Sequence, residues 1–194
     1  MLFVITGDGK GKTTASIGQA IRVAGGLGAP EGSGEGGRVW FGQFIKSPAW
    51  VTGEDKMFAR IPEIEHHKLG LGFVGILNDT LPHSAHKEAA QKALGLAEAA
   101  IKSSKYALVV LDEINAAVSL KLLSARAVLR VVSPPKPNLP RAATNHLLLT
   151  TPDIILTGRN APASFLRAGD IVTECRETKH IFNKGVRGKK GREF

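Results

Sequence analysis

MLFVITGDGKGKTT, residues 1–14, predicts the architecture of this 194-residue chain more clearly than any other segment. Its apolar start, residues 1–5, does not alternate with polar residues, which is typical of a strand buried on both faces in a parallel sheet. Glycines follow at once, and residues 13–24 then place Ile17, Ile21 and Ala24 at helical spacing on one face. The order of strand, glycine-rich turn and helix indicates the first unit of an α/β fold.

The alternation of strands and helices continues along the chain. Apolar runs predict strands at residues 39–44, 64–69, 106–111, 153–156 and 169–174. Helical periodicity predicts helices at residues 53–60, 83–103, 116–131 and 162–168, while the glycine-rich 25–37 and the proline-rich 134–140 are expected to be loops. We therefore expect one domain over residues 1–194, with a mainly parallel sheet and helices on both faces in three layers.

The turn after the first strand has the composition of a phosphate-binding loop. Its glycines let backbone amides point at phosphate oxygens, and the following helix adds the positive end of its dipole. Lys12 supplies a cation for the outer phosphates, and Thr13 supplies a hydroxyl for Mg²⁺. The strict pattern G-x-x-x-x-G-K-[ST] would put glycine where Thr6 stands, so this is a variant loop. It predicts a P-loop NTPase-like fold that binds ATP through Gly7, Asp8, Gly9, Lys10, Gly11, Lys12, Thr13 and Thr14.

A pair of acids closes the apolar run at residues 107–111. In an open parallel sheet, ligands bind at the carboxyl ends of the strands, so Asp112 and Glu113 should face Lys12 and Thr13. The predicted magnesium ligands are Thr13, Asp112 and Glu113. Two other interpretations stay open at this point: Glu113 as the base of a simple ATPase or phosphotransferase, and a surface acid pair that begins a helix.

Composition limits the classes of function. The single cysteine, Cys175, cannot form an intrachain disulfide, and the chain begins with neither a basic leader nor an apolar run long enough to span a membrane, so we expect a cytoplasmic protein without a membrane partner. The formal net charge of +9 favours a polyanionic partner. About half of that excess lies in residues 179–194, where aromatic residues are sparse, so nucleic-acid binding is the weakest of the hypotheses.

The order of motifs resembles one known family over nearly the whole chain, the ATP:corrinoid adenosyltransferases, also called cob(I)alamin or cob(I)yrinic acid a,c-diamide adenosyltransferases. The variant phosphate loop with threonine first is typical of that family. The matching segments are TGDGKGKTTA (6–15), QFIK (43–46), GE (53–54), LGF (71–73), VLDE (110–113), LTGR (156–159), KHIFNKG (179–185) and GREF (191–194).

This resemblance implies a homodimer that binds magnesium-ATP with the ribose 5′ carbon exposed. A corrinoid cobalt reduced to Co(I) attacks that carbon and triphosphate leaves whole, in the biosynthesis or salvage of adenosylcobalamin. The protein's task is then to align nucleophile and carbon and to neutralise the departing phosphates. A flavoprotein reductase that supplies the electrons is an expected partner.

The resemblance also assigns roles to single residues. The predicted catalytic residues are Lys12, Lys46, Phe73, Glu113 and Arg159. Lys46 and Arg159 follow strands and are expected to contact the phosphates of ATP, although both could be ordinary surface cations. Phe73 matches an aromatic residue beside the corrin ring, and the alternative is a core phenylalanine; Gly75 stands where the family often has tryptophan.

The histidines give no metal site at this level. His66 and His67 are adjacent on a predicted strand and therefore point to opposite faces of the sheet. His83 and His86 lie near the start of a predicted helix, without an evident acidic partner, and are expected in solvent.

Overall fold

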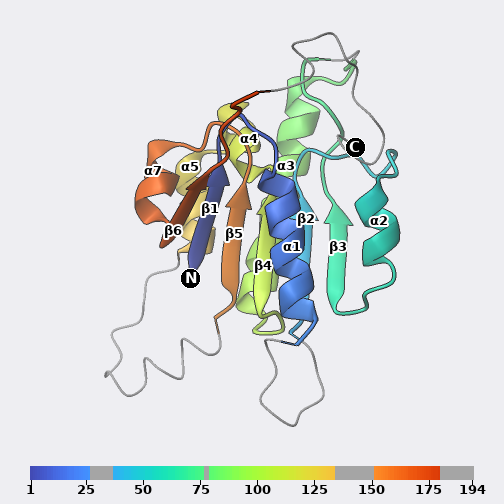
Figure 1. Ribbon diagram of the computed structural model, residues 1–194. Coiled ribbons are helices and arrows are strands. Elements are labelled where there is room, and N and C mark those ends of the chain that lie inside the picture. The colour runs from blue at the N-terminus through green and yellow to red at the C-terminus, as the bar shows by residue number, and fades with distance from the viewer. Residues whose placement is uncertain (27–36, 77–78, 134–150, 180–194) are drawn as a thin grey trace.

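Six parallel strands form one sheet in the computed structural model, which describes residues 1–26, 37–76, 79–133 and 151–179 (Figure 1). The strands are β1 (Leu2–Thr6), β2 (Val39–Gln43), β3 (Ile64–Lys68), β4 (Leu108–Asp112), β5 (Asp153–Thr157) and β6 (Ile171–Glu174). The helices are α1 (Lys12–Ala24), α2 (Gly53–Phe58), α3 (His83–Lys102), α4 (Ile114–Ser119), α5 (Ala125–Val132) and α7 (Ala163–Ala168). The sheet order is β3-β2-β4-β5-β1-β6, and every pairing is parallel.

The sheet separates two hydrophobic cores, as its alternating side chains require. In β4, Val109 and Leu111 belong to a core shared with α3, α4, α5 and α7. The intervening Leu108 and Val110 belong to the opposite core, shared with α1 and α2. In Figure 1, α1 lies in front of the sheet, on the face that carries this second core. The predicted three-layer α/β fold with helices on both faces is confirmed, and the apolar runs of β1 and β4 are explained by burial on both sides.

The topology brings distant segments together at one edge. The order places β5 between β1 and β4, and β2 next to β4. Because all six strands run the same way, residues that follow β1, β2, β4 and β5 meet at the carboxyl edge. The phosphate loop, Lys46, the acid pair and Arg159 all leave the sheet there.

The helix predicted at residues 116–131 is wrong in one respect, because the structure has two helices there. α4 ends at Ser119, and Lys121 adopts a left-handed conformation with φ 60°. Ser124 then begins α5 by accepting a hydrogen bond from the Ala127 backbone at 3.1 Å, as an N-cap serine does. The break turns the apolar face of α5 towards α3 and α7.

Two other expectations about helices also need correction. α1 buries the small residues Ser16, Ala20 and Ala24, while Ile21 is exposed, because small side chains allow the helix to approach the sheet closely. His86 is buried rather than solvated, and its Nε2 lies 3.0 Å from the Asp79 carboxylate, an acid that sequence spacing did not suggest as a partner.

Three predicted segments lie wholly or mostly outside the described residues. They are most of the glycine-rich stretch 25–37, the proline-rich stretch 134–140 and the basic tail from residue 184, together with His180. In the described part of the chain, no helix combines the length and the apolar character needed to cross a bilayer.

Candidate active site

The phosphate loop connects β1 to α1 and requires glycine at three positions. Gly7 and Gly11 have φ of 102° and 113°, values that favour glycine. A Cβ atom at Gly7 would lie 2.3 Å from the Cys175 carbonyl oxygen, and one at Gly9 would lie 2.6 Å from the Arg176 backbone. Because α1 begins at Lys12, its free backbone amides face the loop, which is the geometry of an anion site at a helix N-terminus.

Residues 175–177 brace this loop, a contact that sequence reasoning missed. The Gly9 backbone N–H donates to the Cys175 carbonyl at 2.8 Å, and the Cys175 N–H donates to the Thr6 carbonyl at 2.8 Å. Glu177 N–H donates to the exposed Asp8 carboxylate at 3.3 Å, and this hydrogen bond lowers the pKa of Asp8. The pairing of β6 with β1 could have suggested the contact, since β6 leads directly into these residues.

The unusual first residue of the loop also has a structural role. The Thr6 hydroxyl accepts a hydrogen bond from the Ala161 backbone N–H at 3.1 Å. Glycine at this position could not make that bond. The variant loop is therefore tied through Thr6 to the segment that follows β5 and carries Arg159.

Lys12 is buried at the start of α1, with its ammonium group held inside the loop. Its Nζ donates to the Gly9 carbonyl at 2.6 Å. Burial is the main cause that lowers the pKa of Lys12, followed by the charge of Arg159, while Glu113 opposes the shift. The predicted loop residues Lys10, Thr14 and Asp8 are more exposed, so Lys12 is the loop cation most enclosed by the site.

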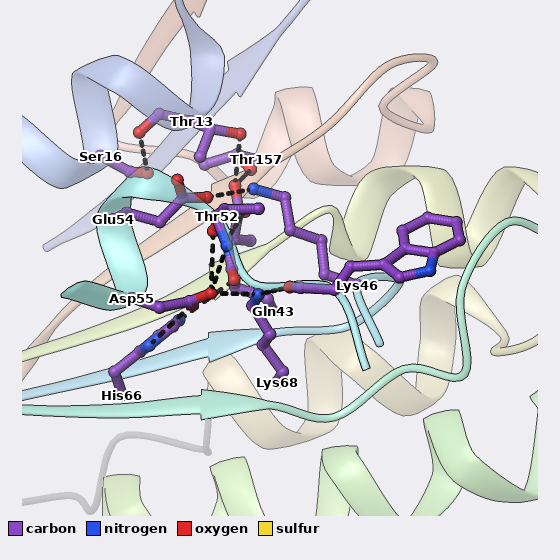
Figure 2. Close-up of polar contacts among 12 residues, drawn as sticks. Thr13, Ser16, Gln43, Lys46, Thr52, Glu54, Asp55, His66, Lys68 and Thr157 are labelled. Carbon is purple, nitrogen blue, oxygen red and sulfur yellow. Dashed lines mark hydrogen bonds and ion pairs between the residues drawn. The ribbon is translucent and has the colours of Figure 1, made fainter. Parts of the chain in front are cut away.

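Asp112 is fully buried at the end of β4 and meets three elements. Its Oδ1 accepts hydrogen bonds from the Thr13 hydroxyl at 2.9 Å and the Thr157 hydroxyl at 2.6 Å, and its Oδ2 accepts from the Gln43 amide at 3.0 Å. Figure 2 shows Thr13, Thr157 and Gln43 converging from α1, β5 and β2. The structure thus places Thr13 in contact with Asp112, the first acid of the predicted pair.

Thr13 and Asp112 fit a magnesium ion chemically. A hydroxyl and a carboxylate are hard oxygen donors, and the three hydrogen-bond partners of the buried Asp112 carboxylate are two hydroxyls and an amide, without a positive charge. In the described part of the chain no three His, Cys, Asp or Glu side chains gather into a dedicated metal site. This suits Mg²⁺, which proteins hold through one or two side chains together with water and phosphate oxygens.

Glu113 occupies a strained and charged position beside Asp112. It caps α4 with φ 64°, and its backbone N–H donates to the Thr157 hydroxyl at 3.0 Å. Burial, aided by the charge of Asp112, raises the pKa of Glu113 to about 6, while Lys12, Lys46 and Arg159 act in the opposite direction. The charges of all three predicted cations therefore act on one carboxylate, and with a pKa of about 6 Glu113 can change protonation near neutral pH.

The raised pKa of Glu113 predicts how the free energy of unfolding depends on pH. In the unfolded chain Glu113 titrates near its ordinary value of 4.5, so the stability that its protonated form contributes is present below 4.5 and is lost as pH rises through about 6. We expect Glu113→Gln to increase the free energy of unfolding by about 1–2 kcal/mol above pH ~7, with little gain at pH ~4.5. Urea unfolding at both pH values measures the difference. Glu88→Gln, at an exposed site on α3, is the control, and an equal gain at both pH values would contradict the assignment.

Lys46 and Arg159 reach this centre from different loops. Lys46 Nζ is paired with Glu54 Oε1 at 2.5 Å, and Arg159 is exposed just after Gly158, whose φ is 126°. A Cβ atom on Gly158 would lie 3.2 Å from Glu113 Oε2, which shows how closely this loop approaches the acid. Sequence reasoning did not identify Glu54 as the partner of Lys46.

A buried polar network continues from Asp112 away from the phosphate loop (Figure 2). Gln43 donates to Asp112, so its amide oxygen accepts from His66 Nε2 at 3.1 Å. His66 Nδ1 lies 3.7 Å from Asp55, which pairs with Lys68 at 2.5 Å. As expected, His66 and His67 point to opposite faces: His66 packs on Phe41 and Phe58, and His67 packs on Trp40. His66 is thus linked to Asp112 through the Gln43 side chain.

Phe73 does not join the charged cluster. It is 40% exposed on the loop after β3, so the core alternative does not hold. Its ring packs on Trp50, with centroids 5.0 Å apart and planes tilted by 50°. Trp50 was not among the predicted site residues, and sequence periodicity could not identify it, because it lies in a loop.

Comparison with known proteins agrees with this geometry. The whole chain, residues 1–194, matches the family described as ATP:corrinoid adenosyltransferase BtuR/CobO/CobP. It is 34% identical over 195 residues to the corrinoid adenosyltransferase of Pseudomonas aeruginosa, covering 100% of this chain and 83% of that protein. It is 31% identical to the corresponding protein of a Sinorhizobium species and 29% identical to that of Escherichia coli K12, again over 100% of this chain and over 80% and 85% of those proteins.

Proposed function

The chain belongs to the ATP:corrinoid adenosyltransferase family, and we propose that it transfers the 5′-deoxyadenosyl group of ATP to the Co(I) ion of a corrinoid, releasing triphosphate. The observation that carries this proposal is the family match over residues 1–194, which includes the phosphate loop and the acid pair. The reaction serves adenosylcobalamin biosynthesis or salvage.

The chain's own residues supply two functions in this reaction. The loop amides of residues 7–11 and the Lys12 ammonium bind the phosphates, with Lys46 and Arg159 adding positive charge around them. Since triphosphate departs with its full charge, these cations stabilise the leaving group as the C5′–O bond breaks. The electron pair of Co(I) forms the new cobalt–carbon bond.

Magnesium is part of the proposal, held by Thr13 and Asp112, with Glu113 beside them. When bound, Mg²⁺ neutralises phosphate charge and fixes the conformation of the triphosphate. Thr13 and Asp112 would hold the ion, and the hydrogen bonds from Thr157 and Gln43 would keep the Asp112 carboxylate in place. The reaction does not require Glu113 as a base, because this transfer removes no proton from the nucleophile. Glu113 instead orients water or the metal.

A P-loop ATPase or phosphotransferase is the alternative, and the products separate the two. We expect incubation of the protein with ATP, Mg²⁺ and chemically reduced corrinoid, without oxygen, to yield intact triphosphate and a cobalt–carbon bond in equal amounts. Anion-exchange chromatography identifies the phosphate product, and the corrinoid absorbance spectrum reports the bond. ADP and inorganic phosphate, formed without a change in the corrinoid, would refute the proposal.

Several further features are proposals that rest on the family and on the sequence. We propose that residues 1–194 act as one domain, that two copies form a homodimer, and that a flavoprotein reductase delivers electrons to the corrinoid. The single cysteine favours the cytoplasm. Sedimentation of the purified protein checks the dimer, and salt-dependent retention on DNA or RNA would revive the nucleic-acid hypothesis.

A further inference from the structure

Glu54 is the acid that pairs with Lys46, one of the cations assigned to the phosphates of ATP. The Lys46 ammonium donates to Glu54 Oε1 at 2.5 Å, and the two side chains are 30% and 16% exposed (Figure 2). Lys46 follows β2 at the carboxyl edge of the sheet, and Glu54 reaches it from the first turn of α2. Because the pair is half-buried, solvent screens it only in part, and Glu54 holds Lys46 more firmly than a surface acid would.

The first turn of α2 keeps Glu54 in a fixed place. Thr52 begins the helix with a capping box: its backbone N–H and its hydroxyl donate to the Asp55 carboxylate at 2.6 Å and 3.1 Å. Lys68, on β3, donates to the same carboxylate at 2.5 Å and so ties this turn to the sheet. Glu54 is therefore the fixed partner of the pair, whereas Lys46, with its long flexible side chain, is the partner that can move.

The Lys46 ammonium lies within electrostatic reach of a second carboxylate. Its charge acts on Glu113, next to the predicted magnesium ligands. Burial acts to raise the pKa of Glu54, but the hydrogen bond and the charge of Lys46 outweigh it and hold that pKa below its ordinary value. Glu54 is thus ionised at neutral pH, so a negative charge is bound to a cation that the phosphates of ATP also need.

A polyphosphate and Glu54 compete for the same cation. Lys12 already points into the phosphate loop, so it needs no new position when phosphate arrives. Lys46 differs, because its ammonium is taken by a carboxylate. If it kept Glu54 and also bound phosphate, two negative groups would be held close together around one positive charge, which like-charge repulsion disfavours. Binding of polyphosphate therefore requires Lys46 to leave Glu54.

We propose that Glu54 is a positioning residue that holds Lys46 beside the phosphate-binding centre and exchanges it for phosphate oxygens when ATP binds. After the transfer, Glu54 competes with triphosphate for Lys46 and so favours release of this product. The inference rests on the proposed function, because triphosphate is the product of that reaction. A competing carboxylate is useful there, since a highly charged product has to leave a site that contains several cations.

The test measures binding of inorganic triphosphate in the presence of Mg²⁺, by isothermal titration calorimetry at neutral pH. We expect Glu54→Gln to lower the Kd of triphosphate about threefold to tenfold, because Lys46 is no longer paired and a like charge is gone. Triphosphate should also inhibit adenosyl transfer at a correspondingly lower concentration. Glu54→Asp keeps the charge and should stay closer to wild type. Glu63→Gln is the matched control, because Glu63 is another half-buried acid but precedes β3 at the amino edge of the sheet, and it should leave the Kd unchanged.

A double-mutant cycle separates exchange of the cation from simple repulsion. Lys46→Met should weaken triphosphate binding by itself. In the Lys46→Met protein, Glu54→Gln should strengthen binding by less than it does in the wild-type protein, because no ion pair has to be broken. An equal gain in both proteins would show that only the charge of Glu54 matters, and it would overturn the exchange.

Two other results would also overturn the inference. Weaker triphosphate binding in Glu54→Gln would mean that Glu54 helps Lys46 to hold phosphate, and an unchanged Kd would mean that the pair does not affect the site. Neither measurement needs a corrinoid, so the inference can fail while the wild-type protein still forms the cobalt–carbon bond. If the wild-type protein releases no triphosphate from ATP with reduced corrinoid, the proposed function itself is refuted, and the role of Glu54 in product release is refuted with it.

Discussion

Lys12→Ala lowers kcat/KM for adenosyl transfer by about a thousandfold or more, the largest effect that we expect from one substitution. Lys12 is buried at the start of α1, and its ammonium group already points into the phosphate loop, where it donates to the Gly9 carbonyl at 2.6 Å. When triphosphate departs, its charge increases at the oxygen that leaves C5′. A fixed cation that is already stripped of water stabilises this charge without reorganising.

Steady-state kinetics with reduced corrinoid measure the effect, and equilibrium binding of ATP separates its causes. A loss that falls mainly on kcat would place Lys12 at the transition state, whereas a loss only in the KM for ATP would give it a role in uniform binding. Lys92→Ala, at an exposed lysine on α3, should leave both constants unchanged. Activity of Lys12→Ala within tenfold of wild type, with unchanged folding, would refute the assignment of Lys12.

Asp112→Asn has the second-largest expected effect, a loss of about a hundredfold to a thousandfold in kcat/KM together with loss of the dependence on Mg²⁺. Both carboxylate oxygens of Asp112 accept hydrogen bonds, from Thr13 and Thr157 on one side and Gln43 on the other. Asparagine keeps the shape but removes the charge that a metal needs. Its NH₂ group would also face a donor, which should lower stability by about 1–3 kcal/mol.

The measurement is the affinity for ATP with and without Mg²⁺. In wild type the metal should strengthen binding, and in Asp112→Asn it should make almost no difference. Asp153→Asn is the control, because Asp153 lies at the opposite end of β5, where it pairs with the amino terminus at 2.6 Å. If Asp112→Asn kept the full Mg²⁺ dependence, Asp112 would not be a magnesium ligand.

The sequence predicted the order of elements well because the local signals were strong. The buried strand β4 is an unbroken apolar run in the sequence, which predicts a strand directly. The closely spaced glycines of the phosphate loop predict a turn. The helix predicted at residues 116–131 was wrong because its periodicity continues across Lys121, where the backbone turns left-handed. The buried face of α1 was shifted because the depth of packing against a sheet depends on side-chain size as well as on spacing.

The features of the candidate site also fall into two groups, those that the sequence predicted and those that only the structure revealed. The residue types of a nucleotide site were legible in the chain: a cradle of glycines with Lys12 and Thr13, and a carboxylate pair at the end of an apolar strand. Only the folded structure decided that Gln43 and Thr157 orient Asp112, that Cys175 and Glu177 brace the loop, and that Trp50 packs on Phe73. Local conformational preferences depend on residues that are neighbours in the sequence. These contacts join residues up to 169 positions apart, and they form only when the strands have taken their order in the sheet.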